Sequence, residues 1–193
     1  MSRAPEDLTA TPGQTVGPFY GFALPYDGDN ELVPGSHPDA VRLHGLVLDG
    51  AGQPVPDALV EVWQADPSGT VPRAAGSLAR NGYTFTGWGR CATDNTGRWS
   101  FTTLRPGATT PGAAPYFAIT VFARGLLNRL FTRAYLPDDA DDTGATLAAD
   151  PLLSSVEESR RGTLVARPDE HGYVFDIRLR GEGETVFLTY PRH

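Results

Sequence analysis

The side chains that most often carry out chemistry are few in this sequence, and they lie far apart. No two histidines have the spacing of two or four positions that places both imidazoles on one face of a strand or helix. The four histidines are His37, His44, His171 and His193. The lone cysteine, Cys91, sits in a strand-like apolar run, which favours a small core residue over a nucleophile, and no P-loop or nucleophile elbow is present. The residues alone therefore predict no catalytic or metal centre within this chain.

A short acidic run is another candidate for ion binding. It consists of Asp138, Asp139, Asp141 and Asp142. Its spacing does not match a calcium-binding loop, and it lacks the glycine that the sharp turn of such a loop needs. We therefore interpret it as a solvated loop.

The stretch 114–139 offers one positive charge in a well-defined place. Its residues alternate as in a β-hairpin, with a turn near Arg124-Gly125 and a return strand over Arg129–Leu136. One face of the first strand carries Tyr116, Ala118, Thr120 and Phe122, and the other carries Phe117, Ile119, Val121 and Ala123. The outer end of the hairpin thus presents the Arg124 guanidinium, while the strand holds no tight metal ligand.

The remaining elements must position this hairpin. Short strands separated by Gly- and Pro-rich turns are expected at 41–48, 59–64, 88–93, 98–104, 162–166, 173–180 and 184–190, in addition to the two strands of the hairpin. A long loop covers 70–86, and Asp150 followed by Pro151 predicts the start of one short helix. Residues 1–39 read as an extended N-terminal arm and an irregular segment. The pattern predicts an all-β fold, a β-sandwich of about nine short strands forming a single domain over 1–193.

Composition excludes several kinds of partner. The net charge of −7 and the lack of a basic tract argue against nucleic acid. No apolar run approaches the roughly 20 residues of a membrane span, and the N-terminal region lacks the apolar core of a signal peptide. With one cysteine and no internal disulfide, these features predict a cytoplasmic protein that does not associate with membranes.

Motifs along nearly the whole chain resemble the intradiol ring-cleavage dioxygenases. Within that family the chain is most similar to the α subunit of its hetero-oligomeric members, particularly in the G-E-G-E-T-V-F segment. The stretches that carry the resemblance are Thr11–Phe19, Val60–Asp66, Gly89–Gly97, Arg105–Gly107, Phe122–Gly125, Thr132–Leu136, Arg160–Ala166 and Phe175–Phe187. The resemblance implies a β-sandwich, in agreement with the strand pattern.

The resemblance also implies which positions would hold a metal. Catalytic members bind a non-haem Fe(III) through two tyrosines and an H-x-H pair. The H-x-H positions fall on Tyr116 and Ala118, the second tyrosine position falls on Thr109, and the first lies approximately at Ser77. We therefore expect this chain to bind no iron, and the implied Fe(III) belongs to a partner β subunit.

The resemblance further implies a role beside that partner. In the family, a multi-copy α–β assembly cleaves 3,4-dihydroxybenzoate with O₂ to 3-carboxy-cis,cis-muconate, at a site between the subunits. The α subunit contributes substrate-binding residues, which correspond here to Thr15, Gly17, Pro18, Phe19 and Arg124. A fixed guanidinium suits the substrate carboxylate, and Gly and Pro allow close backbone approach to a flat ring.

Other interpretations stay open at this point. The chain could be a non-catalytic, stand-alone β-sandwich that binds or scaffolds other molecules, or an iron enzyme that uses unusual ligands. Arg124 could be a solvated turn residue, and the arm could be a terminal loop on its own domain.

Overall fold

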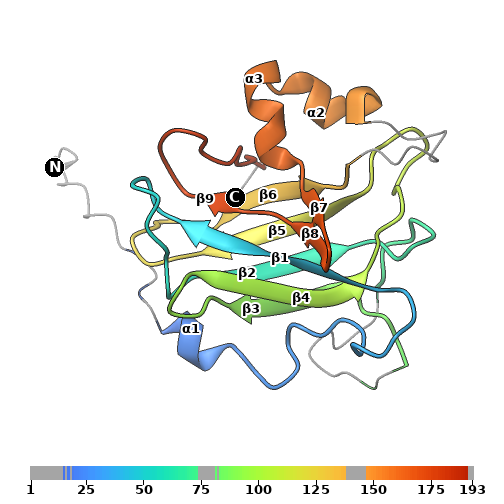
Figure 1. Cartoon of the computed structure of the whole chain (residues 1–193), viewed down its shortest axis with the longest axis horizontal. Helices are drawn as coiled ribbons and strands as arrows, with labels where there is room; N and C mark the ends of the chain where they lie inside the picture. Colours follow the sequence, from blue (N-terminus) through green and yellow to red (C-terminus); the bar gives the residue numbers. More distant parts are fainter. Residues whose placement is uncertain are drawn as a thin grey trace, which may run out of the picture.

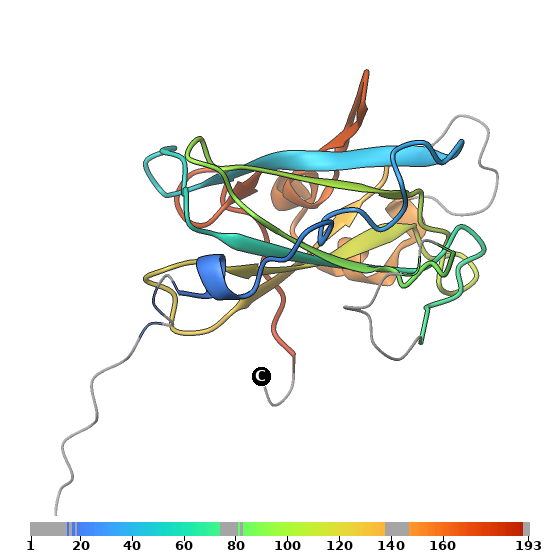
Figure 2. The same cartoon turned by 90° about the horizontal axis from the view of Figure 1, so that it is seen from below.

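The computed structural model describes residues 15, 17, 19–73, 81, 83–137 and 147–190. Its regular elements are mostly strands, arranged in two layers (Figures 1 and 2). The strands are β1 Ala40–Leu48, β2 Leu59–Gln64, β3 Trp88–Ala92, β4 Arg98–Leu104, β5 Tyr116–Phe122, β6 Leu130–Tyr135, β7 Arg167–Asp169, β8 Gly172–Val174 and β9 Ile177–Arg178. The helices are α1 Tyr20–Ala23, α2 Pro151–Ser155 and α3 Glu158–Arg161, with 3₁₀ turns at Leu147–Ala149 and Gly162–Leu164.

The strands form two facing sheets, as expected for a β-sandwich. One sheet has the order β4-β1-β8-β7, with β9 also paired to β1, and the other has the order β3-β2-β5-β6. The hairpin of β5 and β6 is antiparallel and places Tyr116 opposite Tyr135 and Ala118 opposite Arg133. Because β5 also pairs with β2, it is a central strand whose two faces look in opposite directions.

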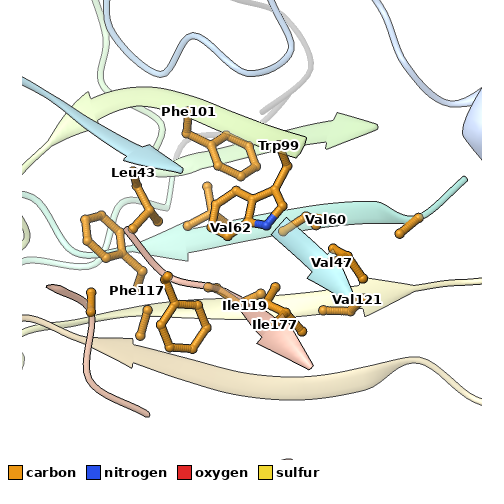
Figure 3. Packing of buried hydrophobic residues seen from close by; sticks show 14 of the residues in the cluster. Leu43, Val47, Val60, Val62, Trp99, Phe101, Phe117, Ile119, Val121 and Ile177 are labelled. Atoms are coloured by element: carbon orange, nitrogen blue, oxygen red, sulfur yellow. The ribbon is translucent and has the colours of Figure 1, made fainter. Parts of the chain in front are cut away.

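The core fills the space between the sheets. Phe117, Ile119 and Val121 of β5 point into it and are almost completely buried (Figure 3). They meet Trp99 and Phe101 of β4, together with residues of β1, β2 and β9. The alternation in β5 thus places Tyr116 and Ala118 on the outer face, away from this core.

A smaller apolar cluster attaches α2 to the end of the hairpin. It contains Tyr135, Leu153 and Leu164, all buried. The Asp150 side chain caps α2 by accepting hydrogen bonds from the backbone N–H groups of Leu152 and Leu153. This confirms the predicted helix start at Asp150 and Pro151.

The strand predictions were accurate in the first two-thirds of the chain and wrong in parts of the last third. In the segment 162–166, Gly162–Leu164 form a 3₁₀ turn, where the Thr163 hydroxyl donates to the Arg160 carbonyl, and only Val165 forms a single β-bridge, to Tyr135. The segment 173–180 is split into β8 and β9 by Asp176, whose carboxylate accepts from the Leu46 N–H at 3.0 Å in place of a backbone carbonyl.

The segment 184–190 forms no β-strand. In its middle, the backbone of Val186 bonds to threonine side chains, since its N–H donates to Thr163 Oγ1 and its C=O accepts from Thr132 Oγ1. Leu188 alone bridges to Phe131. The described residues contain three short α-helices where one was expected, and the short strand β7 was missed. Helices and strands this short leave too little periodic pattern to read.

The buried face of β5 should dominate stability. We expect Phe117→Ala to lower the free energy of unfolding by about 3–5 kcal/mol, because it removes a fully buried ring and leaves a cavity. Leu127→Ala, in the 61% exposed loop position of the same hairpin, should change it by less than about 0.5 kcal/mol. Urea denaturation followed by tryptophan fluorescence measures both; similar losses for the two variants would contradict the placement of Phe117 in the core.

Candidate functional site at the hairpin tip

Arg124 lies at the outer end of the β5–β6 hairpin and is held there by an ion pair. Its Nε is 3.0 Å from Asp57 Oδ2, and the arginine side chain is 64% exposed whereas the aspartate is only 15% exposed. The other Asp57 oxygen, Oδ1, is buried without a hydrogen-bond partner. The pair therefore fixes Arg124 through one edge and leaves its terminal amino groups available at the surface.

Tyr20 of the helix α1 contacts the segment that carries Asp57. Tyr20 is buried, its hydroxyl donates to the Asp57 carbonyl at 3.0 Å, and its ring lies 6.2 Å from that of Phe122. Burial, reinforced by the negative charge of Asp57, raises the pKa of Tyr20 to about 12. The hydroxyl consequently stays protonated and keeps donating to the segment that carries Asp57.

The N-terminal arm reaches the same place. Thr15 Oγ1 accepts a hydrogen bond from the Gly125 N–H at 2.8 Å. Gly125 has a φ of +86°, a conformation that favours glycine, so the tip can turn sharply and aim its N–H at the arm. Two of the residues expected to act together, Thr15 and Arg124, are thus brought to one hairpin tip.

The other predicted arm residues have separate positions. Gly17 also has a positive φ, +75°, and Phe19 immediately precedes α1 with 80% of its surface exposed. Phe22 within α1 is 82% exposed. Both views place α1, the helix that contains Phe22, beside the hairpin tip (Figures 1 and 2). Pro18 lies outside the described residues.

The positions expected to bind metal in catalytic relatives carry a different chemistry here. Tyr116 and Ala118 lie on the outer face of β5, and the Arg133 guanidinium stacks on Tyr116, with Cζ 3.9 Å from the ring centroid. Thr109 is in the loop before β5, whereas Ser77 and the acidic run 138–142 lie outside the described residues. A cation stacked on the one phenol, with no imidazole at either position, does not fit a ferric ion.

The rest of the described chain offers no substitute metal site. Among these residues no three His, Cys, Asp or Glu side chains gather closely enough to hold an ion. Cys91 is half-buried, and burial raises the pKa of its thiol, in keeping with a packing role.

Arg133 is the residue near these positions that sequence reasoning missed. Its Nη1 donates to the Tyr135 hydroxyl at 3.0 Å, and that hydroxyl donates to Asp150 Oδ1 at 3.0 Å. The register of the hairpin could have revealed it, because the expected turn places residue 133 opposite residue 118.

A cavity of about 330 Å³ lies elsewhere and contains none of the predicted site residues. Its lining includes the apolar residues Leu32, Val33 and Leu104 and the titratable residues Asp27, Glu31, His37 and Tyr83. Size alone does not make it the functional site, and no three acidic, histidine or cysteine side chains among the described residues gather there to hold an ion.

The chain matches a family of known proteins over more than half its length. The family model described as "Dioxygenase" matches residues 16–116. The protocatechuate 3,4-dioxygenase alpha chain of Burkholderia cepacia is 39% identical, over 94% of this chain and 98% of the relative. The chain belongs to the intradiol dioxygenase family. The alpha chain from Pseudomonas putida is 38% identical over 96% of this chain, and a Burkholderia cepacia beta chain is 34% identical over 87% of it.

Solved structures of the family share the fold. An intradiol ring-cleavage dioxygenase from Tetranychus urticae superposes with a TM-score of 0.59 at 16% identity, covering 77% of this chain and 84% of that one. Catechol 1,2-dioxygenase from Acinetobacter superposes with a TM-score of 0.52 at 21% identity, covering 84% and 60%. These neighbours confirm the two-sheet architecture. Separately, no helix in the described part of the chain is long and apolar enough to cross a bilayer.

The link between the arm and the hairpin tip can be tested by amide exchange. Thr15→Val removes the acceptor for the Gly125 N–H, and one such hydrogen bond is worth about 0.5–1.5 kcal/mol. We expect exchange of the Gly125 amide to become roughly 2- to 10-fold faster in hydrogen–deuterium exchange read by NMR. Thr110→Val, at an exposed threonine in another loop, is the matched control. Unchanged exchange at Gly125 would show that Thr15 does not hold the tip.

Proposed function

We propose that this chain is the α subunit of a protocatechuate 3,4-dioxygenase, which acts with a homologous β subunit on 3,4-dihydroxybenzoate and O₂ to give 3-carboxy-cis,cis-muconate. The observation that carries the proposal is the similarity to two alpha chains over 98% of their length. The beta-chain relative is covered over only 78% of its length. The lone cysteine suits a cytoplasmic, reducing location for this assembly.

The metal of this reaction belongs to the partner in our proposal. Fe(III) held by the β subunit would supply the chemistry that makes the catechol ring reactive toward O₂. The residues of this chain support placing the iron in the β subunit. Ala118 and Thr109 have neither a phenol nor an imidazole to bind iron, and the positively charged Arg133 guanidinium lies over the Tyr116 ring.

The contribution of this chain is to shape and charge a site across the subunit boundary. Arg124 is suited to it because the Asp57 ion pair fixes Nε and leaves the terminal amino groups for a substrate carboxylate. The other residues that we propose to bind substrate are Thr15, Gly17, Pro18 and Phe19.

An interface at this end of the molecule agrees with its surface. Phe19 and Phe22 expose more than three-quarters of their area to solvent in the isolated chain. Large aromatic rings are enriched in the buried centres of protein–protein interfaces, where they lose contact with water. We therefore place the β subunit against α1, the arm and the hairpin tip.

Co-expression with an iron-bearing β subunit tests the proposal directly. We expect the two chains to co-elute, the complex to cleave 3,4-dihydroxybenzoate, and the isolated chain to be colourless, free of iron and inactive. The same chain purified with no β subunit is the control. A stable monomer that never co-elutes would favour the scaffold interpretation, whereas tyrosinate-to-iron colour in the isolated chain would favour an iron enzyme.

The role of Arg124 gives a sharper prediction within the complex. Arg124→Ala should weaken binding of 3,4-dihydroxybenzoate roughly 10- to 150-fold, the equivalent of one charge-assisted hydrogen bond of about 1.5–3 kcal/mol. Binding of catechol, which has no carboxylate, should change little. Steady-state kinetics with both substrates measures the difference.

Two further variants separate recognition from folding. Arg124→Ala with Asp57→Asn avoids leaving a poorly solvated carboxylate unpaired. Arg167→Ala removes a 72% exposed arginine from the other sheet and should leave both substrates unaffected. Equal losses for the two substrates in the double variant would show that Arg124 does not read the carboxylate.

A further inference from the structure

The helix α1 has little in its own sequence to stabilise it. It consists of only four residues, Tyr20–Ala23, and a single helical turn is unfavourable in water without further contacts. Phe19, which precedes it, makes no side-chain cap hydrogen bond, and α1 has no acidic residue in its first turn and no basic residue in its last turn. The position of α1 therefore depends on contacts with other parts of the chain.

Both ends of α1 are held from outside the helix. At its first residue, the Tyr20 hydroxyl donates to the Asp57 carbonyl at 3.0 Å. At its C-terminal cap, the Leu24 carbonyl accepts a hydrogen bond from Arg90 Nη1 at 2.9 Å. A carbonyl at the end of a helix has no partner within the helix, and a cation there is favourable. Arg90 thus supplies from β3 the basic group that α1 itself lacks.

The Arg90 guanidinium is held in place while it makes this contact. Its side chain is only 13% exposed, Nη2 lies 2.7 Å from Glu61 Oε1 on β2, and Cζ lies 4.9 Å from the centroid of the Trp88 ring. Its backbone N–H donates to the Asp29 carbonyl at 3.0 Å, so the same residue also fixes the segment that follows α1. A mostly buried ion pair adds little net stability, because the loss of hydration offsets the attraction. The effect of this pair is therefore geometric, since it directs Nη1 toward the end of α1.

A displacement of α1 would reach the Arg124 tip through Asp57. The carbonyl of Asp57 accepts from Tyr20, and its carboxylate pairs with Arg124 at 3.0 Å. Burial raises the pKa of Tyr20 and the Arg124 charge opposes this effect, so the tyrosine and the arginine lie close together. Arg90, α1 and the hairpin tip are consequently linked by a continuous series of contacts.

We infer that Arg90 is a positioning residue, which caps α1 from β3 and thereby holds the exposed rings of Phe19 and Phe22, together with the hairpin tip, in the arrangement that the β subunit meets. The inference rests on the proposed function and deepens it. It assigns the position of the partner-binding surface to a residue outside the set that we propose to bind substrate.

Two variants separate the helix cap from the ion pair. Arg90→Met with Glu61→Gln removes the cap without leaving a buried carboxylate unpaired, whereas Glu61→Gln alone keeps Arg90 and its bond to Leu24. We expect the double variant to bind an iron-bearing β subunit about tenfold more weakly, the loss of one hydrogen bond to a charged group. In the assembled complex, KM for 3,4-dihydroxybenzoate should rise severalfold while kcat and KM for catechol change little. Glu61→Gln should behave as the wild type does.

Arg161→Met is the matched control. Arg161 caps α2 as Arg90 caps α1, because its Nε donates to the Val156 carbonyl at 2.9 Å and its Nη2 to the Ser154 carbonyl at 3.1 Å. In Figure 1, α2 lies on the opposite side of the sheets from α1. This variant should therefore leave the affinity for the β subunit and both KM values unchanged.

The isolated chain tests the cap without a partner. The Leu24 N–H donates to the Tyr20 carbonyl within α1. We expect exchange of the Leu24 amide, measured by NMR, to be about tenfold faster in the double variant. Exchange at Leu24 should be unchanged in Glu61→Gln and in Arg161→Met.

Three results would overturn the inference. The first is wild-type affinity and KM in the double variant, and the second is an equal loss in Glu61→Gln. The third is a lowered thermal transition of the double variant with equal increases in KM for both substrates, which would show a general loss of structure. A wild-type chain that does not bind the β subunit would instead contradict the proposed function, and unchanged Leu24 exchange in the double variant would still refute the cap.

Discussion

The alternation of side chains along β5 is the constraint on which the rest of the molecule depends. Because β5 pairs with β2 on one side and β6 on the other, its backbone is fixed and its side chains can point only inward or outward. Phe117, Ile119 and Val121 point inward and join the two sheets. The same geometry sets Tyr116 and Ala118 on the opposite face, so the core and the outer surface are specified together.

The two arginines of this hairpin have opposite environments. Arg124, beyond the end of β5, has a carboxylate partner in Asp57 and remains largely exposed. Arg133, in the middle of β6, is half-buried among tyrosines and donates a hydrogen bond to the Tyr135 hydroxyl. Burial tends to lower the pKa of Arg133, but the Tyr135 hydrogen bond and the neighbouring tyrosines raise it overall, so the side chain stays charged. Arg124 is therefore held in position at the surface by Asp57, and Arg133 is a cation that lies between the rings of Tyr116 and Tyr135.

The family relationship acquires a physical meaning from this arrangement. The resemblance to catalytic members implies an H-x-H pair at positions 116 and 118, and this chain has a phenol and a methyl group there. The frame that would present those ligands persists because its inward-facing side makes the core. Substitutions on the outer face of β5 cost little stability, since the residues that hold the sheets together are on the other side of the strand.

Much of the fold could be predicted from the sequence, because strong local patterns determine it. The strands 59–64 and 98–104 have the predicted bounds, and Asp150 and Pro151 begin a helix as expected. The position of Arg124 at a turn could also be predicted, since it depends on residue identity and on a period of two.

Tertiary structure decided the rest through contacts between residues far apart in sequence. Asp57 meets Arg124, Thr15 meets Gly125, and Asp176 interrupts the last long strand by bonding to Leu46. No local pattern encodes these partners. The sequence by itself determined which residues face the core and which residue types stand on the outer face, because alternation and residue type are local properties. Which charges are paired among the described residues follows only from how the strands and loops come together in space.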